Sequence, residues 1–318
     1  MDNSLNKTPL VAVVGPTASG KTKLGVDIAL KFNGEVVSAD SMQIYLGMSI
    51  ATAKPTLDEM RGVPHHLIDF LPPEQGYSVA RYVDDAKASI ADITARGKLP
   101  VLVGGTGLYV DALLGGIRFS EEPGTPEIRA QLYEQAAQLG NEAMHAMLAQ
   151  IDPEYAKGLH PNNLGRVLRA IELYRATGKT MSEQLKSSRE KPSDYAPIMI
   201  GLSFSDRAKL YERIDYRVDL MLQQGLLEEV RAFYKTHNPK TAAQAIGCKE
   251  FLSFLNGEKT LEECTDDLKR ETRRYAKRQL TWFKRNSQIS WLNYDEFDSY
   301  QALLDKAYSI ISNGLSHR

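Results

Sequence analysis

The sequence contains little cysteine, which limits the kinds of site that it can build. Its only cysteines among 318 residues are Cys248 and Cys264. Two thiols cannot supply the disulfide framework of a small secreted protein, and no Cys-X-X-Cys spacing suggests a zinc site. We therefore expect a reduced, cytoplasmic setting.

Long hydrophobic runs are also absent. The N-terminal stretch MDNSLNKTPL is polar, and the apolar run at residues 10–14 spans only five residues. Such a run is too short for the core of a signal peptide or for a membrane span. We expect no membrane association, and we take a monomer as the working assumption because the sequence leaves the oligomeric state open.

No excess of charge points to a nucleic-acid partner. The 39 Lys and Arg residues nearly balance the 40 Asp and Glu residues, and the formal net charge is −1. A polyanionic partner would therefore have to be held by a local basic patch. With 42% hydrophobic and 25% charged residues, the composition is that of a folded protein with one large or two modest domains.

Alternating strand and helix patterns in the first third predict an α/β fold. Short β-branched or apolar segments at residues 10–14, 35–39 and 99–105 read as strands, and a helical pattern runs from about Ser78 to Arg96. Strands separated by helices favour a parallel sheet covered by helices on both faces. We expect a three-layer P-loop core.

The pattern changes after the first third. Residues 121–196 show only helical patterning, whereas strand-like segments return at 197–204 and 289–293. We therefore predict a discontinuous catalytic core, residues 1–120 with 197–318, interrupted by an all-helical insertion domain at 121–196. A capping-box pattern at Thr260–Glu263 predicts a helix that runs to about Arg285.

A phosphate-binding loop follows the first predicted strand. Residues 15–22 fit the pattern GxxxxGK[ST] between a strand and a helix. Backbone amides and the helix N-terminus would surround phosphate oxygens, Lys21 would add a full charge, and the Thr22 hydroxyl would reach a magnesium ion. By itself the loop indicates only that phosphates bind, and the predicted ligands are Gly15, Pro16, Thr17, Ala18, Ser19, Gly20, Lys21 and Thr22, which the resemblance described below assigns to a diphosphate.

Two further segments end at the same edge of the predicted sheet. Asp40 follows the second strand, and the turn at residues 104–107, which contains Thr106, follows the third. Ligands bind at the carboxyl edge of open parallel sheets, so both segments are candidates for the site. From position alone, Asp40 could equally cap the next segment, and the glycine-rich turn could be an ordinary tight turn.

Cations are concentrated late in the chain. Eight Lys and Arg residues lie between positions 269 and 285, against one acid, Glu271. Helical spacing places them on adjacent faces, which is typical of a phosphate-binding stripe, although a bare charge run more often marks a solvated face. The adjacent histidines His65 and His66 point apart in an extended chain, and we interpret them as structural.

The motifs resemble, in order, those of the tRNA dimethylallyltransferases, the tRNA isopentenyltransferase family. The matching segments cover nearly the whole chain: GPTASGKT (15–22), SADSMQIY (38–45), ATAKP (51–55), PHHLID (64–69), GGTGLY (104–109), ERIDYRV (212–218) and AKRQLTWFKRN (276–286). The phosphate loop is shared with many kinases, whereas SADSMQIY together with the late basic block is specific to this family.

The resemblance implies an activity and roles for individual residues. The enzyme would transfer a dimethylallyl group from dimethylallyl diphosphate, with Mg²⁺, to the exocyclic amine of the adenosine 3′ to the tRNA anticodon. Asp40 would be the general base, and Arg217 and Thr106 would contact the diphosphate. The residues expected to contact the tRNA anticodon stem-loop are Asp40, Ser41, Met42, Gln43, Thr106, Arg166, Arg169, Gly247, Lys249, Lys277, Arg278, Gln279, Trp282 and Lys284.

Two positions depart from the family pattern, and three other functions stay open. Gly165 replaces a glutamine and Cys248 a tyrosine, which removes a polar contact and a stacking contact. A P-loop small-molecule kinase would use ATP and lid arginines such as Arg166 and Arg169. An adenylate prenyltransferase would not need the late basic helix, and an RNA-binding protein with a vestigial loop would not need Lys21, Thr22 and Asp40.

Overall fold

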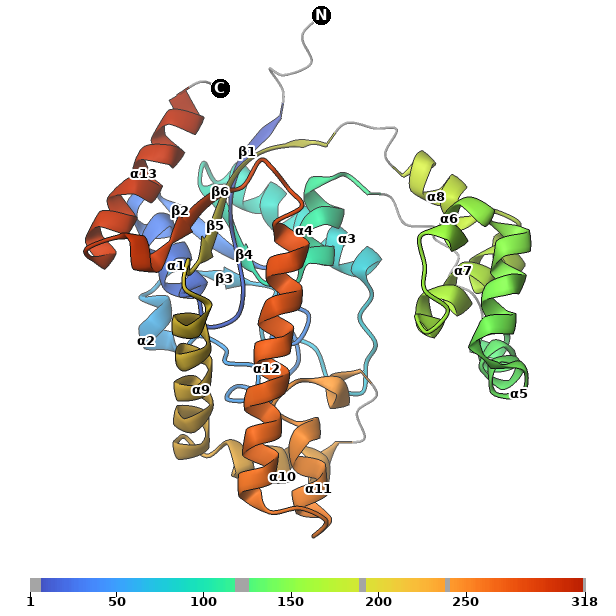
Figure 1. Ribbon diagram of the computed structural model, residues 1–318. Coiled ribbons are helices and arrows are strands. Elements are labelled where there is room, and N and C mark those ends of the chain that lie inside the picture. Colours follow the sequence, from blue (N-terminus) through green and yellow to red (C-terminus); the bar gives the residue numbers. More distant parts are fainter. Residues whose placement is uncertain (1–6, 118–125, 189–192, 238–240, 317–318) are drawn as a thin grey trace, which may run out of the picture. The chain divides into compact units, whose positions relative to one another are not determined.

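The computed structural model describes residues 7–117, 126–188, 193–237 and 241–316 (Figure 1). The chain divides into two compact units: Met1–Leu114 together with Ser193–Arg318, and Gly115–Pro192. The first unit contains a six-stranded sheet, and the second consists of helices. The strands are β1 (Thr8–Val14), β2 (Gly34–Ser38), β3 (His65–His66), β4 (Leu99–Gly104), β5 (Tyr195–Ser203) and β6 (Ser290–Asn293).

Helices of the first unit surround this sheet and extend beyond one edge of it. Three short 3-10 turns lie at Ala242–Gln244, Lys249–Phe251 and Tyr294–Glu296. The α-helices are α1 (Lys21–Lys31), α2 (Leu57–Met60), α3 (Val79–Ala95), α4 (Gly107–Leu114), α9 (Arg207–Gln223), α10 (Leu226–Thr236), α11 (Leu252–Leu255), α12 (Leu261–Phe283) and α13 (Tyr300–Ser316).

All strand pairs in the sheet are parallel, in the order β3-β2-β4-β1-β5-β6. The α/β fold expected from the sequence is therefore confirmed. The buried strand β1 lies between β4 and β5, and its carboxyl end leads directly into the phosphate loop. Strand β3 was not expected: His65 and His66 pair with Val36 and Val37 over only two residues, too few to produce a sequence pattern.

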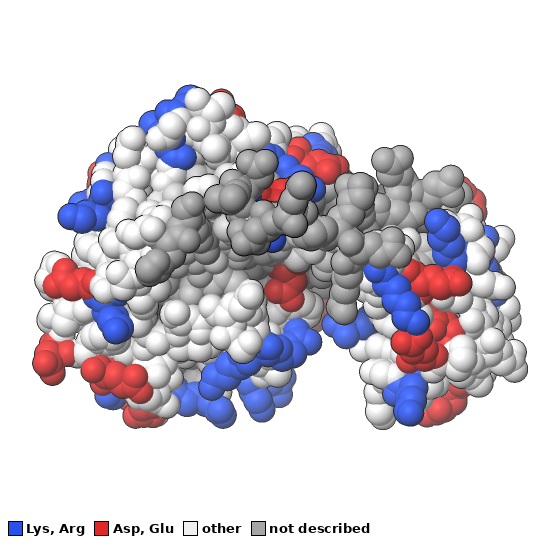
Figure 2. Space-filling view, turned by 90° about the horizontal axis from the view of Figure 1, so that it is seen from above, with Lys and Arg blue, Asp and Glu red and all other residues white. Residues whose placement is uncertain are grey.

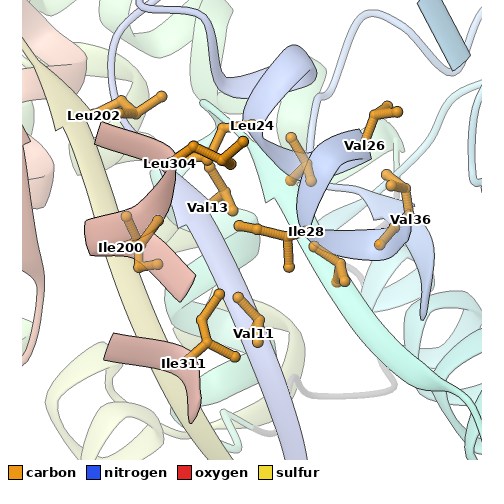
Figure 3. Packing of buried hydrophobic residues seen from close by; sticks show 14 of the residues in the cluster. Val11, Val13, Leu24, Val26, Ile28, Val36, Ile200, Leu202, Leu304 and Ile311 are labelled. Atoms are coloured by element: carbon orange, nitrogen blue, oxygen red, sulfur yellow. The ribbon is translucent and has the colours of Figure 1, made fainter. Parts of the chain in front are cut away.

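One hydrophobic cluster joins the sheet to α1 and α13 (Figure 3). Val11 and Val13 of β1 point toward Leu24 and Ile28 of α1, and Ile311 of α13 closes the cluster. Helices α3 and α4 contact each other outside this cluster, where Tyr82 and Tyr109 stack at 4.0 Å between ring centroids. Successive apolar residues of a strand point to opposite faces of the sheet and so pack against two layers of helices.

A second cluster lies beyond the carboxyl ends of β1, β2 and β4. Ile44 and Tyr45, which follow β2, pack with residues of α9, α10 and α12. Helix α12 begins at the predicted capping box, in which Thr260 and Glu263 each accept from the other's backbone N–H, and it ends at Phe283 rather than Arg285. This cluster holds α9 and α12 against the edge where the phosphate loop lies.

The helical unit has a core of its own, built on Leu132, Met144, Leu148 and Ile171. Non-helical torsion angles at Gly140 interrupt its longest helix. The first expected domain boundary, between residues 120 and 121, lies outside the described residues. The second, between 196 and 197, would cut β5, which already pairs with β1 at Tyr195. The helices are α5 (Pro126–Ile151), α6 (Pro153–Lys157), α7 (Leu164–Thr177) and α8 (Met181–Ser187).

Candidate active site

A cavity of about 350 Å³ lies at the carboxyl edge of the sheet. The phosphate loop, the segment after β2, the end of β4, helix α9 and helix α12 all contribute to its wall. Residues that are far apart in the sequence are therefore brought together here. The wall includes these residues singled out from the sequence: Thr17, Ala18, Lys21, Thr22, Asp40, Ser41, Met42, Gln43, Gly247, Lys249, Arg217, Arg278 and Gln279.

The phosphate loop has the tight backbone that its glycines predict. Gly15 has φ 141°, and a Cβ there would lie 2.2 Å from the carbonyl oxygen of Leu202. Gly20, with φ 90°, is the N-cap of α1, so the loop passes directly into a helix N-terminus. The fully buried Ser19 hydroxyl is without a hydrogen-bond partner in the described part of the chain. The loop therefore offers backbone amides and a hydroxyl to an anion.

Lys21 is buried without a carboxylate partner among the described residues. Its Nζ donates to the Pro16 carbonyl oxygen at 2.6 Å. Burial and the nearby Arg217 lower the pKa of Lys21 to about 7, while Asp40 acts in the opposite direction. A buried ammonium with a lowered pKa gains most when an anion arrives beside it.

Two arginines one turn apart on α9 reach the phosphate loop. Arg213 Nε donates to the Ala18 carbonyl oxygen at 3.0 Å, and Arg217 Nη1 donates to Thr17 Oγ1 at 3.3 Å. Burial lowers the pKa of Arg217, while Asp40 partly offsets this effect. The loop thus meets positive charge from its own Lys21 and from the opposite wall, which suits a ligand with two linked phosphates.

Asp40 lies two residues beyond the end of β2 and lines the cavity. Its Oδ1 accepts the backbone N–H groups of Met42 at 2.9 Å and Gln43 at 3.3 Å. In the described residues, no hydrogen bond to Oδ2 is recorded and Asp40 forms no ion pair. One oxygen therefore fixes the carboxylate, and the other can accept a proton from a ligand.

The remaining side chains of this segment hold the wall of the cavity. Gln43 Nε2 donates to the carbonyl oxygens of Thr52 and Ala53 at 3.1 and 3.0 Å. Thr106 Oγ1 accepts the Ser41 backbone N–H at 3.0 Å, and Thr106 does not itself line the cavity. Thr106 thus orients the segment after β2, while the expected contacts of Thr106 with diphosphate and tRNA stay predictions.

One face of α12 packs against the turn after β4. The 5%-exposed Gln279 donates from Nε2 to the Gly105 carbonyl oxygen at 2.9 Å, and its Oε1 accepts the Thr17 N–H at 2.8 Å. A Cβ on Gly107 would lie 2.2 Å from the Trp282 ring, whose Nε1 donates to Asp111. These glycines are therefore needed for close packing of side chains from α12.

The cations of α12 fall into two groups. Ion pairs hold four of them: Lys269 to Asp219 at 2.6 Å, Arg270 to Asp267, Arg273 to Asp215 at 2.5 Å and Arg274 to Glu271 at 2.6 Å. In the described ranges, Lys277, Arg278, Lys284 and Arg285 form no such pair. Figure 2 shows Lys and Arg side chains gathered along one edge of the larger unit, with mixed charges elsewhere on that face.

The unpaired cations reach two different surfaces. Arg278 lines the main cavity, as Gln279 does. Lys277 and Lys284 line a separate hollow of about 100 Å³ between α12 and α9, whose wall also includes Arg207. The residues expected to contact tRNA on α12 therefore do not form a single surface: Lys277 and Lys284 face the hollow, whereas Gln279 and Trp282 pack inward.

The expected tRNA contacts in the helical unit lie on α7. Arg169 Nη1 pairs with the buried carboxylate of Glu172 at 2.9 Å, and Arg129 pairs with the same group. Arg166 forms no ion pair in the described part of the chain. A Cβ on Gly165 would meet open space, so the surface of α7 has no packing reason for glycine at this position.

Several residues of the site were not singled out from the sequence. Arg213 precedes Arg217 by four residues and Tyr275 precedes Gln279 by four, so helical spacing was the available signal. Gln244, which begins the segment 244–249 that the family resemblance implies for tRNA contact, also lines the cavity. Cys248 is buried in the second cluster and burial raises the pKa of its thiol to about 12, so it replaces the family's tyrosine with a core residue.

The residues around Thr22 fit a magnesium ion that is held mainly by a substrate. Thr22 lines the cavity beside Lys21. No group of three or more His, Cys, Asp or Glu side chains that could hold a metal occurs in the described residues. Mg²⁺ commonly takes few protein ligands and completes its shell with phosphate oxygens and water. His65 and His66 instead bond to the Val63 carbonyl oxygen and to Glu35.

Comparisons with known proteins agree with the resemblance seen in the motifs. A family model described as IPP transferase matches residues 43–286. The chain is 47% identical to the tRNA dimethylallyltransferase of Caldanaerobacter subterraneus, covering 96% of this chain and 98% of that protein. It is 48% identical to the tRNA dimethylallyltransferase of Bacillus subtilis, covering 90% and 91%.

Solved structures give the same result. The full-length tRNA isopentenylpyrophosphate transferase of Bacillus halodurans has a TM-score of 0.72 at 42% identity, covering 98% of this chain and all of that chain. A eukaryotic dimethylallyltransferase whose structures were determined acting on tRNA has a TM-score of 0.85 at 31% identity. That match covers 98% of this chain and 80% of the other. Among the described residues, no helix is long and apolar enough to cross a membrane.

Proposed function

The chain belongs to the IPP transferase family, and from this we propose that it transfers a dimethylallyl group from dimethylallyl diphosphate to a tRNA adenosine. The acceptor is the exocyclic amine of the adenosine 3′ to the anticodon, and diphosphate is released. One observation carries the proposal: a single cavity joins the phosphate loop, Arg217, the Asp40 carboxylate and residues of the basic helix α12. With tRNA as the acceptor, we also propose a cytoplasmic location.

The phosphate loop and α9 would bind the diphosphate of the prenyl donor. Loop amides, Lys21 and Arg217 lie where they would stabilise the charge that develops as the carbon–oxygen bond to diphosphate breaks. A magnesium ion at Thr22 would supply further stabilisation of the phosphate charge. The loop recognises linked phosphates whatever they carry, so the choice of dimethylallyl diphosphate over ATP as the donor rests on the family.

The apolar part of the cavity would hold the five-carbon chain. Ile214, Val218 and Met221 of α9 line it together with Leu268 of α12. Gly104 and Gly105 of the turn after β4 also line the cavity, and side chains of α12 pack closely against Gly105 and Gly107. An apolar wall also limits water, which would otherwise capture the allylic cation that develops during transfer.

Asp40 would act as the general base. As the adenine amine nitrogen bonds to the first carbon of the prenyl group, the carbon–oxygen bond breaks and the amine loses a proton to the carboxylate. A base in hydrogen-bond reach typically contributes a factor of ~10²–10⁴. The anchored Oδ1 holds Asp40 in place, and its second oxygen would be the proton acceptor.

Direct transfer to tRNA tests this proposal. The protein is incubated with Mg²⁺, dimethylallyl diphosphate and unmodified tRNA, and the digested nucleosides are analysed by mass spectrometry, with Lys21→Met as the control. We expect isopentenyl-modified adenosine from tRNA in step with diphosphate release. Modification of free adenylate in place of tRNA, or ADP formed from ATP in step with product, would instead support the prenyltransferase or kinase alternatives.

A further inference from the structure

Gln279 joins three parts of the site. Its side chain leaves α12, accepts the Thr17 N–H of the phosphate loop at 2.8 Å and donates to the Gly105 carbonyl oxygen after β4 at 2.9 Å. Both ends of the amide are therefore used, which requires the oxygen to face the loop and the nitrogen to face Gly105. A buried side chain with both ends bonded fixes the spacing of the two segments.

The absence of a side chain at Gly105 makes room for the Gln279 amide. A Cβ at position 105 would lie 2.1 Å from Gln279 Nε2. Even alanine at position 105 would therefore displace the amide that holds the loop. Gly105 lines the cavity and is also the point where α12 reaches the turn after β4.

Thr17 is held from two helices at once. Gln279 accepts its backbone N–H, and Arg217 of α9 donates to its hydroxyl at 3.3 Å. Thr17 lies within the loop that also carries Lys21 and Thr22. Because the amides of a phosphate loop act through their direction, a shift of Thr17 would change how the loop meets a diphosphate.

We propose that Gln279 is a positioning residue for the phosphate loop, and that it is not an RNA contact. The inference rests on the proposed function only for the identity of the ligand, a diphosphate. Gln279 is 5% exposed, whereas its neighbour in the sequence, Arg278, carries an unpaired charge into the cavity. Adjacent residues of α12 thus have different roles: Arg278 is available to ligand, and Gln279 holds the loop.

The first test uses Gln279→Met, which keeps the length of the side chain and removes both hydrogen bonds. Binding of inorganic diphosphate with Mg²⁺ is measured by calorimetry without tRNA, well below the unfolding temperature. We expect binding roughly three- to tenfold weaker, the factor expected for loss of the one hydrogen bond that orients the loop, from the Thr17 N–H. We expect KM for dimethylallyl diphosphate to rise in parallel, and the dissociation constant for tRNA to change less than about twofold. Gln301→Met on α13, which loses an exposed bond to Asp305, is the matched control and should change neither.

A second test approaches the same contact from the other side. Gly105→Ala should weaken diphosphate binding in the wild-type background, because its Cβ displaces the Gln279 amide. In a Gln279→Ala background the space is free, and Gly105→Ala should add little, so the two effects are strongly non-additive. This cycle keeps the inference testable if Gln279→Met folds poorly.

Three results would overturn the inference. A weaker tRNA affinity with unchanged diphosphate binding would make Gln279 an RNA contact. A lower melting temperature with unchanged diphosphate binding would make its role purely structural. Additive effects in the cycle would mean that Gly105 does not act through Gln279. Because inorganic diphosphate is the probe, these results are separate from any failure of prenyl transfer itself.

Discussion

The first four and the last four cations of the run from Lys269 to Arg285 have different partners, although the sequence presents them as one basic run. Lys269, Arg270, Arg273 and Arg274 in the first half each face a carboxylate. Lys277, Arg278, Lys284 and Arg285 form no ion pair in the described part of the chain, and Arg285 lies over the Trp282 ring at 4.4 Å. In the first group, Lys269 and Arg273 hold α12 to α9, whereas Arg270 and Arg274 pair with acids of α12 itself. The second group has no carboxylate to give up when an anionic ligand arrives.

This difference shows what a charge count omits. A cation that already has a carboxylate must exchange that partner for a phosphate, whereas an unpaired cation gains the whole interaction. The paired cations can serve as a control for the unpaired ones, because they are the same residue types in the same basic run. The predictions below use it as the control.

The largest effect is expected where a carboxylate has no cation partner. Asp40→Asn should lower turnover by ~100-fold or more, because asparagine cannot accept the amine proton. Asp215→Asn, at the carboxylate paired with Arg273, should leave turnover of the folded enzyme near that of the wild type. Single-turnover transfer with saturating tRNA measures both. Near-normal turnover in Asp40→Asn would remove Asp40 from the base role.

The second-largest effect is expected on tRNA binding. Lys277→Ala with Lys284→Ala should weaken binding of unmodified tRNA roughly tenfold at moderate salt. Each lost phosphate contact should also lower the slope of log affinity against log salt by just under ~1. Filter binding over a salt series is the measurement.

The matched variant for that experiment is Arg270→Ala with Arg274→Ala, which removes two cations of the same helix that already have acid partners. It should keep the wild-type slope. Equal slopes for the two double variants would mean that paired and unpaired cations of α12 do not differ toward RNA.

For the free energy of unfolding, we expect the paired cations to matter more than the unpaired ones. Arg273→Ala breaks a half-buried pair in which Nη1 lies 2.5 and 2.7 Å from the two oxygens of Asp215, and should cost about 1 kcal/mol of unfolding free energy. Lys277→Ala should change it by less than about 0.5 kcal/mol. Urea unfolding of both variants measures these changes in unfolding free energy. A larger loss of unfolding free energy for Lys277→Ala than for Arg273→Ala would contradict the division of these cations into a paired and an unpaired group.

The smallest effect concerns the unpaired cation inside the cavity. With a pKa of about 7, Lys21 is mostly neutral at pH 8, and a bound diphosphate favours its charged form. Diphosphate binding at pH 8 should therefore take up a fraction of a proton, fading below pH 6 where Lys21 is already charged. Calorimetry in two buffers of different ionisation enthalpy measures this uptake. Lys21→Met should take up less at pH 8, and equal uptake would assign the proton to the ligand.

The sequence predicted those features that depend on neighbouring residues. The strand at 10–14, the loop at 15–22 and the capping box at Thr260 all appear where local patterns placed them. Strand ends shifted by one or two residues, because hydrogen bonding to a neighbour sets the end of a strand. β5, for example, begins at Tyr195 opposite Thr8.

Local sequence patterns could not predict contacts between distant segments. Gln279 and Thr17 are 262 positions apart, and no periodicity connects them. The division of the α12 cations also depends on partners in other elements, such as Asp215 and Asp219 on α9. The residue types of the site could therefore be predicted from the family's motifs, but which side chains touch a ligand and which hold the wall could not.

Strand order in the sheet has a consequence for synthesis of the chain. β1 lies between β4 and β5, and β5 begins at Tyr195, after the whole helical unit. A nascent chain emerges N-terminus first, so the strand that carries the phosphate loop stays without one neighbour until the helical unit has been made. An unpaired strand edge invites pairing with other chains. The length of the helical unit thus determines how long the edge of β1 stays unpaired during synthesis, before β5 emerges and pairs with it.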